Sequence, residues 1–105
     1  LKVILDRNRI QNDDFCETQL RMFDIPGKWR SFGWDVMEID GHNTKEVVKG
    51  LDFLISNNDN PAILIANTIK GKGVSYMEDN PAFHGAAPND EQFRVAMEEL
   101  GEVLA

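Results

Sequence analysis

The stretch Ala62-Ile-Leu-Ile-Ala66 decides the fold of this chain, because an unbroken apolar run suits a strand that is buried on both faces of a sheet. Two other β-prone runs precede it, at residues 2–5 and 34–39. A helical pattern lies between the second run and the third. Strands that alternate with helices are typical of right-handed βαβ crossovers, so we expect a parallel sheet with helices packed on it.

Two amphipathic helices are predicted from their starts and their apolar periodicity. Asn43 stands three residues before Glu46, as in a capping box, and apolar residues then recur at helical spacing until about Asn57. These residues are Val47, Val48, Leu51, Leu54 and Ile55. Asn89 and Gln92 have the same spacing and open a last helix. Its apolar face comprises Phe93, Ala96, Met97, Leu100, Val103 and Leu104, and the glutamates Glu98, Glu99 and Glu102 are expected on a solvated face.

The segment between the first two strands is less regular, because Pro26 and Gly27 interrupt any single helix there. A short helix from Pro26 to Phe32 would put Trp29 and Phe32 on one side. Core packing is the expected role of four aromatic residues, Trp29, Trp34, Phe53 and Phe93. The prediction is an α/β fold with three layers, a parallel sheet with flanking helices, and residues 1–105 forming a single domain.

Composition excludes several classes of function. The 18 acidic residues outnumber the 11 Lys and Arg residues, and the net charge of −7 leaves no basic face for a phosphate backbone, so we expect no nucleic-acid binding. No window approaches the roughly 20 apolar residues of a membrane span, and a soluble, cytoplasmic protein is expected. Cys16 is the only cysteine, which excludes an internal disulfide and a cysteine metal cage; a half-buried small side chain is its expected role.

A first candidate site follows the first strand, at residues 7–14. Ligands of open α/β sheets bind beyond the carboxyl ends of the strands, which is where Asn8 to Gln11 would lie. The side-chain oxygen of Asn8 is of the kind that Mg²⁺ or Ca²⁺ prefers. From the residues alone, a polar loop with Asn and Asp as turn formers explains the segment better than a metal site does.

A second candidate site follows the third strand. In Lys70-Gly-Lys-Gly73 the glycines allow a close turn and the lysines supply positive charge, although the pattern lacks the spacing of a Walker phosphate loop. His84 lies in a loop between Phe83 and Gly85, where its ring could donate one hydrogen bond and accept another. The alternatives are a solvated Lys-Gly turn and an exposed histidine without a ligand.

Three stretches together resemble transketolases, in the same order along the chain. They are Leu5-Asp-Arg-Asn-Arg-Ile-Gln11, Gly33-Trp-Asp-Val-Met-Glu-Ile-Asp-Gly-His42, and residues 67–88, which contain Lys-Gly-Lys-Gly and Phe-His-Gly-x-x-Pro. The resemblance covers essentially the whole chain and points to the carboxyl-terminal half of the domain that binds the diphosphate of thiamine diphosphate. It implies an enzyme that transfers a two-carbon ketol unit between sugar phosphates.

The resemblance also implies roles for individual residues. By the match, Asn8 gives its side-chain oxygen and Ile10 its backbone carbonyl to Mg²⁺ or Ca²⁺, and Asn8, Lys70 and His84 contact the cofactor. His84 also approaches the sugar substrate and is the candidate catalytic residue. His42 has no such role in the match, and the turn around it is expected to cap the helix that follows.

Two departures from the family pattern stand out. The Gly-Asp-Gly motif, whose Asp should be a third metal ligand, does not occur in these 105 residues. Asp14 stands where many members have Gly, which predicts a changed loop backbone. The chain also opens directly in a strand, so we expect a fragment with an exposed sheet edge that is prone to self-association and has no turnover alone.

The partners that the resemblance implies lie outside this chain. They are sugar phosphates, the remainder of the diphosphate-binding domain, and a pyrimidine-binding domain or subunit, within a homodimer or heterotetramer. Two alternatives remain at this point: a non-catalytic α/β binding or scaffold module, and another thiamine diphosphate enzyme such as a deoxyxylulose-phosphate synthase.

Overall fold

The fold was analysed in a computed structural model, which describes the backbone of residues 1–104 and the side chains of residues 1–101. The chain divides into two compact units. The first comprises Leu1–Arg7 and Met22–Thr68. The second comprises Asn8–Arg21 and the residues from Ile69 onward. Each unit therefore consists of two separate stretches of the sequence.

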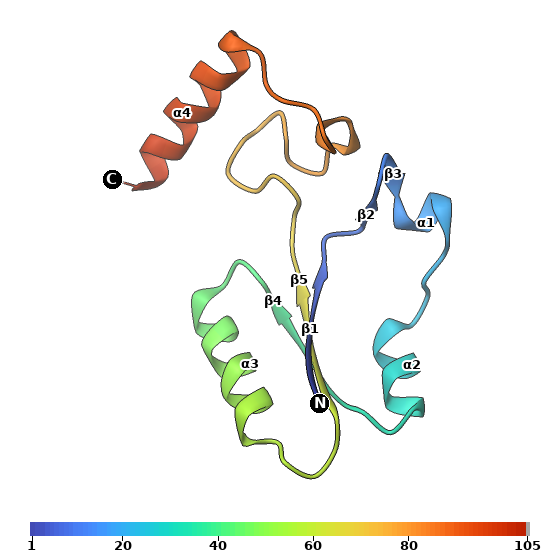
Figure 1. Ribbon diagram of the computed structural model, residues 1–105. Coiled ribbons are helices and arrows are strands. Elements are labelled where there is room, and N and C mark those ends of the chain that lie inside the picture. Colours follow the sequence, from blue (N-terminus) through green and yellow to red (C-terminus); the bar gives the residue numbers. More distant parts are fainter. Residues whose placement is uncertain (105) are drawn as a thin grey trace. The chain divides into compact units, whose positions relative to one another are not determined.

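A parallel sheet of three strands forms the centre of the first unit (Figure 1). The strands are β1 (Lys2–Arg7), β4 (Asp35–Asp40) and β5 (Ala62–Asn67), in the order β1-β5-β4. Arg7 and Asp40 both pair with Asn67 in the register, so the three strands end at the same level. The predicted parallel sheet is confirmed, and each strand lies within one or two residues of its apolar run.

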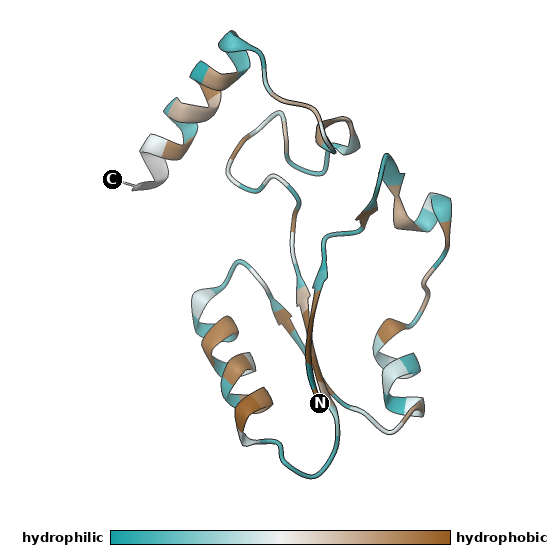
Figure 2. Cartoon of the chain, in the orientation of Figure 1, coloured by the Kyte–Doolittle hydropathy of each residue, from teal (hydrophilic) through white to brown (hydrophobic). Residues whose placement is uncertain are grey.

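Helices cover the two faces of this sheet, which gives the three layers that the sequence predicts (Figure 1). The chain moves from β1 across to β4 and then back to β5, and right-handed crossovers in opposite directions place their helices on opposite faces. α3 (Thr44–Ser56) packs on Ile39 and Leu64, whereas α2 (Ile25–Ser31) packs on Ile63 and Ile65. Figure 2 shows the apolar strands between the two helices.

The start of α3 agrees with the predicted cap, with one difference. The Asn43 side-chain oxygen accepts hydrogen bonds from the backbone N–H of Lys45 at 3.1 Å and of Glu46 at 3.4 Å. The Glu46 carboxylate accepts from the backbone N–H of Asp40 at 2.8 Å, instead of from that of Asn43. This hydrogen bond connects the first turn of the helix to the end of β4. The helix ends with Asn57 as its C-cap, as predicted.

At each end, α2 lies within one residue of the short helix predicted from Pro26 to Phe32. Asp24 caps the helix by accepting from the backbone N–H of Gly27 at 2.9 Å. Trp29 is half-buried and meets Trp34 edge to face, with ring centroids 4.7 Å apart. Phe32 is 81% exposed, because the helix ends at Ser31 and Phe32 forms its C-cap, beyond the packed face.

Burial on both faces holds for β5 but not for β1. The residues from Ala62 to Ile65 are buried, whereas Ile4 on β1 is 56% exposed. β1 is an edge strand, since β5 is its only partner among the described residues. Val3 and Leu5 pack on the cluster under α2, so only one face of β1 contributes to the core.

The second unit contains short elements and one long helix. They are β2 (Ile10–Gln11), β3 (Asp14–Phe15), α1 (Cys16–Gln19), the 3-10 helix η1 (Pro81–Phe83) and α4 (Asp90–Leu104). Asn89 and Gln92 form the predicted capping box, each side chain accepting from the other residue's backbone N–H, at 2.8 and 3.0 Å. None of the described helices is long and apolar enough to cross a membrane.

The expected apolar face of α4 is only partly buried. Ala96 is buried, but Phe93 is 57% exposed, so its assignment to the core is wrong. The side chains of Val103 and Leu104 lie outside the described residues. Glu99 is not simply solvated, because its carboxylate accepts a hydrogen bond from the backbone N–H of Ser75 at 2.7 Å.

Candidate active site

Hydrogen bonds between the strand ends close the carboxyl edge of the sheet. The backbone N–H of Gly41 donates to the Asn67 carbonyl at 2.8 Å, and that of Thr68 donates to the Arg7 carbonyl at 3.2 Å. The Thr68 hydroxyl also donates to the carboxylate of Asp6. The ends of β1 and β5, from which the two candidate loops continue, are therefore held together.

The loop after β1 holds the two predicted metal ligands in one tight turn. Arg9 has a left-handed backbone, with φ of 65°, and the Asn8 side-chain oxygen accepts a hydrogen bond from the backbone N–H of Ile10 at 3.0 Å. The Arg9 carbonyl accepts from the backbone N–H of Cys16 at 2.8 Å. Asn8 is half-buried, and an amide oxygen has a second lone pair that a cation could share.

The next turn contains a left-handed residue close to Asp14, the position where the sequence predicts a changed backbone. Asn12, not Asp14, takes the left-handed conformation, with φ of 54°. Asn tolerates this conformation better than most residues. Asp14 lies in β3, pairs with Gln11, and accepts from the backbone N–H of Phe15 at 2.7 Å. Sequence reasoning expected a polar loop here and missed the short ladder of β2 and β3.

The Lys-Gly-Lys-Gly turn belongs to a closed loop of the second unit. The Lys70 carbonyl accepts from the backbone N–H of Asp79 at 3.1 Å, which joins the two ends of the loop. Gly71 has φ of 75°, and a Cβ there would lie 2.5 Å from the Met77 carbonyl oxygen. The Lys70 side chain is half-buried and has no hydrogen bond or ion pair with the described residues, so its ammonium group is available to a ligand.

The second lysine of this turn is exposed to solvent and also has an ionic partner within the loop. Lys72 Nζ lies 3.3 Å from Glu78 Oε1. The same oxygen accepts from the backbone N–H of Gly73 at 3.0 Å. Sequence reasoning missed Glu78, because a contact across six residues of an irregular turn follows neither helical nor strand spacing.

His84 ends the short helix η1. The Asn80 side chain accepts from the backbone N–H of Ala82 at 3.1 Å to start this helix, and the backbone N–H of His84 donates to the Pro81 carbonyl at 2.9 Å to end it. The imidazole is exposed and makes no hydrogen bond with the described part of the chain. It is presented by a structured turn and is open to a ligand.

Helix α4 is joined to the loop that carries Lys70. The Tyr76 hydroxyl donates to the Gln92 carbonyl at 2.8 Å, and Tyr76 also packs against Phe83 with ring centroids 5.2 Å apart. Hydrogen bonds from the Ser75 side chain and then from its backbone N–H lower the pKa of Glu99 below its ordinary value. These contacts connect the lysine loop, η1 and α4 without using any predicted site residue.

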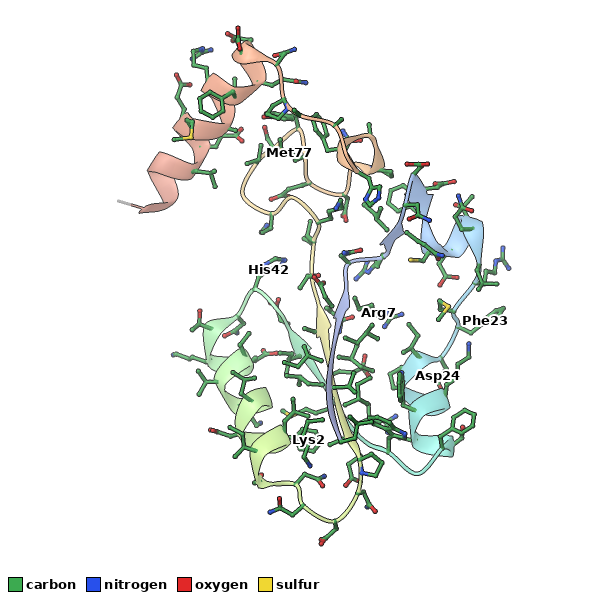
Figure 3. All side chains as sticks on the ribbon, in the orientation of Figure 1. Lys2, Arg7, Phe23, Asp24, His42 and Met77 are labelled. Atoms are coloured by element: carbon green, nitrogen blue, oxygen red, sulfur yellow. The ribbon has the colours of Figure 1, made fainter. Side chains whose placement is uncertain are left out.

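The second unit contains all four predicted site residues, Asn8, Ile10, Lys70 and His84. His42 lies in the first unit, where its backbone N–H donates to the Asp40 side chain at 2.9 Å just before the cap of α3. Among the described residues there is no group of three or more His, Cys, Asp or Glu side chains that could hold a metal ion. Figure 3 shows all described side chains, with His42 at the turn after β4.

Comparison with known proteins identifies the family. Residues 1–103 match the model of the transketolase thiamine diphosphate binding domain. The chain is 36% identical over 102 residues to a subunit of the apulose-4-phosphate transketolase from Phocaeicola vulgatus, covering 97% of this chain and 36% of that protein. It is 33% identical over 85 residues to human transketolase, covering 81% of this chain and 13% of that protein.

Solved structures agree with this assignment. A transketolase from Campylobacter jejuni matches with a TM-score of 0.85 and 26% identity, over 96% of this chain and 16% of that one. A transketolase mutant from Pichia stipitis, at 19% identity, shares the fold with a TM-score of 0.67, over 97% of this chain and 18% of that one. The chain thus spans about a third or less of the relatives that it matches. This chain belongs to the family of transketolase thiamine diphosphate-binding domains.

Proposed function

We propose that this chain provides part of the diphosphate and metal site of a transketolase that moves a two-carbon ketol unit between sugar phosphates. The observation that carries the proposal is the turn from Asn8 to Ile10, which holds an amide oxygen and a neighbouring backbone segment together at the end of β1. Two oxygen donors suit a hard divalent cation, Mg²⁺ or Ca²⁺. The site residues therefore fit the metal by the chemistry of their donors.

The charged and polar groups of the second unit fit a diphosphate. Lys70 supplies an ammonium group without a competing partner in the described chain, and His84 presents an exposed imidazole. Lys70 would neutralise phosphate charge, whereas His84 would donate a hydrogen bond to a phosphate oxygen or move a proton at a substrate hydroxyl. Bound thiamine diphosphate would supply the carbanion chemistry of ketol transfer, and the protein would bind and orient it.

The remaining metal ligand and further contacts to the cofactor and substrate would come from outside this chain. The Gly-Asp-Gly motif is missing from these 105 residues, so the third metal ligand would belong to the remainder of the diphosphate-binding domain. A pyrimidine-binding domain or subunit would hold the other end of the cofactor, in a homodimer or a heterotetramer in the cytoplasm. Relatives that are themselves subunits, such as that of the 6-deoxy-6-sulfo-D-fructose transketolase from Clostridium, support a split enzyme.

The test of this proposal is a titration of the purified 105-residue chain with thiamine diphosphate and Mg²⁺, followed by backbone amide NMR. Local shifts at Asn8, Ile10, Lys70 and His84 are expected. A dispersed spectrum without any of these shifts would contradict binding by this chain. In parallel, a ketol-transfer assay of the chain alone is expected to give no product, and measurable turnover would contradict the need for further domains.

A non-catalytic binding module is the second candidate, and the missing Gly-Asp-Gly motif favours it. Reconstitution distinguishes the two. The chain is combined with the preceding half of the diphosphate-binding domain of the Phocaeicola vulgatus relative and that enzyme's companion subunit. Recovery of ketol transfer supports the enzyme. An assembled complex that binds the cofactor without transfer supports the module.

A further inference from the structure

The Lys-Gly-Lys-Gly turn contains two lysines that differ in their surroundings. Lys72 Nζ lies 3.3 Å from Glu78 Oε1, and the two side chains are 48% and 34% exposed. Lys70 is half-buried and has no ionic partner among the described residues. One of the two neighbouring positive charges is therefore neutralised within the loop, and the other is not.

Glu78 is held in place by more than the lysine. Its Oε1 atom also accepts from the backbone N–H of Gly73 at 3.0 Å. A hydrogen bond to a carboxylate is stronger than a neutral one, and it fixes the side chain that Lys72 approaches. The next backbone N–H, that of Asp79, donates to the Lys70 carbonyl at 3.1 Å. One short segment, Glu78–Asp79, thus contacts the residues of the turn from Lys70 to Gly73.

We propose that Glu78 is a positioning residue that selects Lys70 as the anion-binding lysine, by holding Lys72 and Gly73 and leaving the Lys70 ammonium group for a diphosphate. The inference rests on the proposed function and adds a residue that the family resemblance did not assign. Without Glu78, Lys72 would compete for the same anion and the turn would lose the bond to Gly73.

The two lysines can be distinguished without any ligand by their reaction with an amine-specific acetylating reagent, read by mass spectrometry of the intact folded chain. Because Lys70 is half-buried and Lys72 is exposed, the readout is the ratio of their rates in each variant. In Glu78→Gln the carboxylate is lost, and Lys72 should react about two- to fivefold faster relative to Lys70 than in the wild-type chain, the range that a partly exposed ion pair provides. Asp79→Asn is the matched control, because it removes the neighbouring negative charge, keeps a residue that tolerates φ of 50°, and leaves Glu78 intact.

The same labelling, repeated with inorganic pyrophosphate and Mg²⁺, tests the selection. In the wild-type chain and in Asp79→Asn, pyrophosphate should slow the labelling of Lys70 but not that of Lys72. In Glu78→Gln it should slow the labelling of both lysines. If Glu78→Gln leaves the ratio of rates unchanged while its amide spectrum stays folded, the role of Glu78 is overturned, whatever pyrophosphate does. If the ratio changes but pyrophosphate protects neither lysine, the proposed anion site of this chain is overturned and only the pairing within the loop stands.

An unfolded Glu78→Gln variant would not obscure the result. Lys72→Met removes the competing charge and keeps the bond between Glu78 and Gly73. In this variant, the pyrophosphate protection of Lys70 should stay within about twofold of that in the wild-type chain, because the ion pair that the substitution breaks is partly exposed. If Lys72→Met loses most of the pyrophosphate protection of Lys70 while its amide spectrum stays folded, Lys72 itself binds the anion, which contradicts the selection.

Discussion

The backbone oxygen of Met77 lies 2.5 Å from where a Cβ atom of Gly71 would be. We therefore expect Gly71→Ala to lower the free energy of unfolding by about 3 kcal/mol, the sum of left-handed backbone strain and a steric clash with a fixed backbone atom. Urea unfolding followed by circular dichroism measures the loss.

Gly85→Ala separates the two causes. Gly85 has a similar φ of 83°, but nothing lies within 4 Å of its Cβ position. This variant should lose only the strain, about 1–2 kcal/mol. Equal losses in the two variants would show that the approach of Met77 to Gly71 contributes nothing.

A second close approach lies between α3 and the sheet. A Cβ at Gly50 would lie 2.6 Å from Leu64 Cδ1, in a buried position. Gly50→Ala should lower the melting temperature, because overpacking by about 1–3 kcal/mol exceeds the gain in helix propensity of about 1 kcal/mol. A Cβ at Gly101 in α4 would have no atom within 4 Å, so Gly101→Ala should raise the melting temperature. Stabilisation by Gly50→Ala would contradict the packing.

The Asn8 side chain can be tested as a metal ligand separately from its structural role. Asn8→Ala should abolish binding of Mn²⁺, used as a paramagnetic substitute for Mg²⁺, as seen by line broadening at Ile10. Asn8→Asp keeps an oxygen that can accept from the backbone N–H of Ile10 and can bind the cation, so the broadening should return. Broadening that persists in Asn8→Ala would exclude the side chain as a ligand.

The stability of the folded chain should depend on pH through the ionisation of Glu99. Its pKa lies below the ordinary value of 4.5, mainly because of hydrogen bonding to Ser75. A lowered folded pKa stabilises the protein at pH values above the unfolded pKa, and this contribution is lost as the pH falls through the folded pKa. Glu99→Gln should thus be less stable than the unmodified chain at pH 7, and the difference should shrink below about pH 4 in thermal unfolding. Glu17→Gln, in α1, is the control, and a difference that stays constant with pH would contradict the role of Glu99.

The exposed edge of β1 predicts self-association. Ile4 is 56% exposed on this strand, and unpaired edges with apolar side chains favour pairing with other chains. Ile4→Lys should lower the weight-average mass in sedimentation, with no large loss of stability. Val48→Lys, an equally exposed apolar position on α3, should have less effect. Equal effects of the two variants would indicate nonspecific hydrophobic association and would contradict strand pairing.

The regular elements of the chain were predictable because their signals are local. The apolar run at β5 and the capping side chains Asn43 and Asn89 depend on neighbouring residues, and each was found where the sequence placed it. The exposure of Phe32 and Phe93 was not predictable, because periodicity shows which residues share a face but not whether another element covers that face.

The contacts within the irregular loops could not be predicted from the spacing of residues in the sequence. Glu78 meets Lys72, and Glu99 meets Ser75, through turns whose conformation depends on left-handed residues such as Asp79. No spacing rule encodes such contacts. The sequence therefore placed Asn8, Lys70 and His84 in loops after the strands, but it did not indicate which neighbouring residues hold those loops in shape.

The interleaving of the two units has a consequence for how such proteins can be recombined. The chain changes unit at three places, after Arg7, after Arg21 and after Thr68. A single crossover between two related genes would always leave at least one unit with stretches from different parents. Chimeras that exchange both stretches of one unit together should keep the contacts within that unit between residues of the same parent. A single join places residues of two parents in contact within one unit.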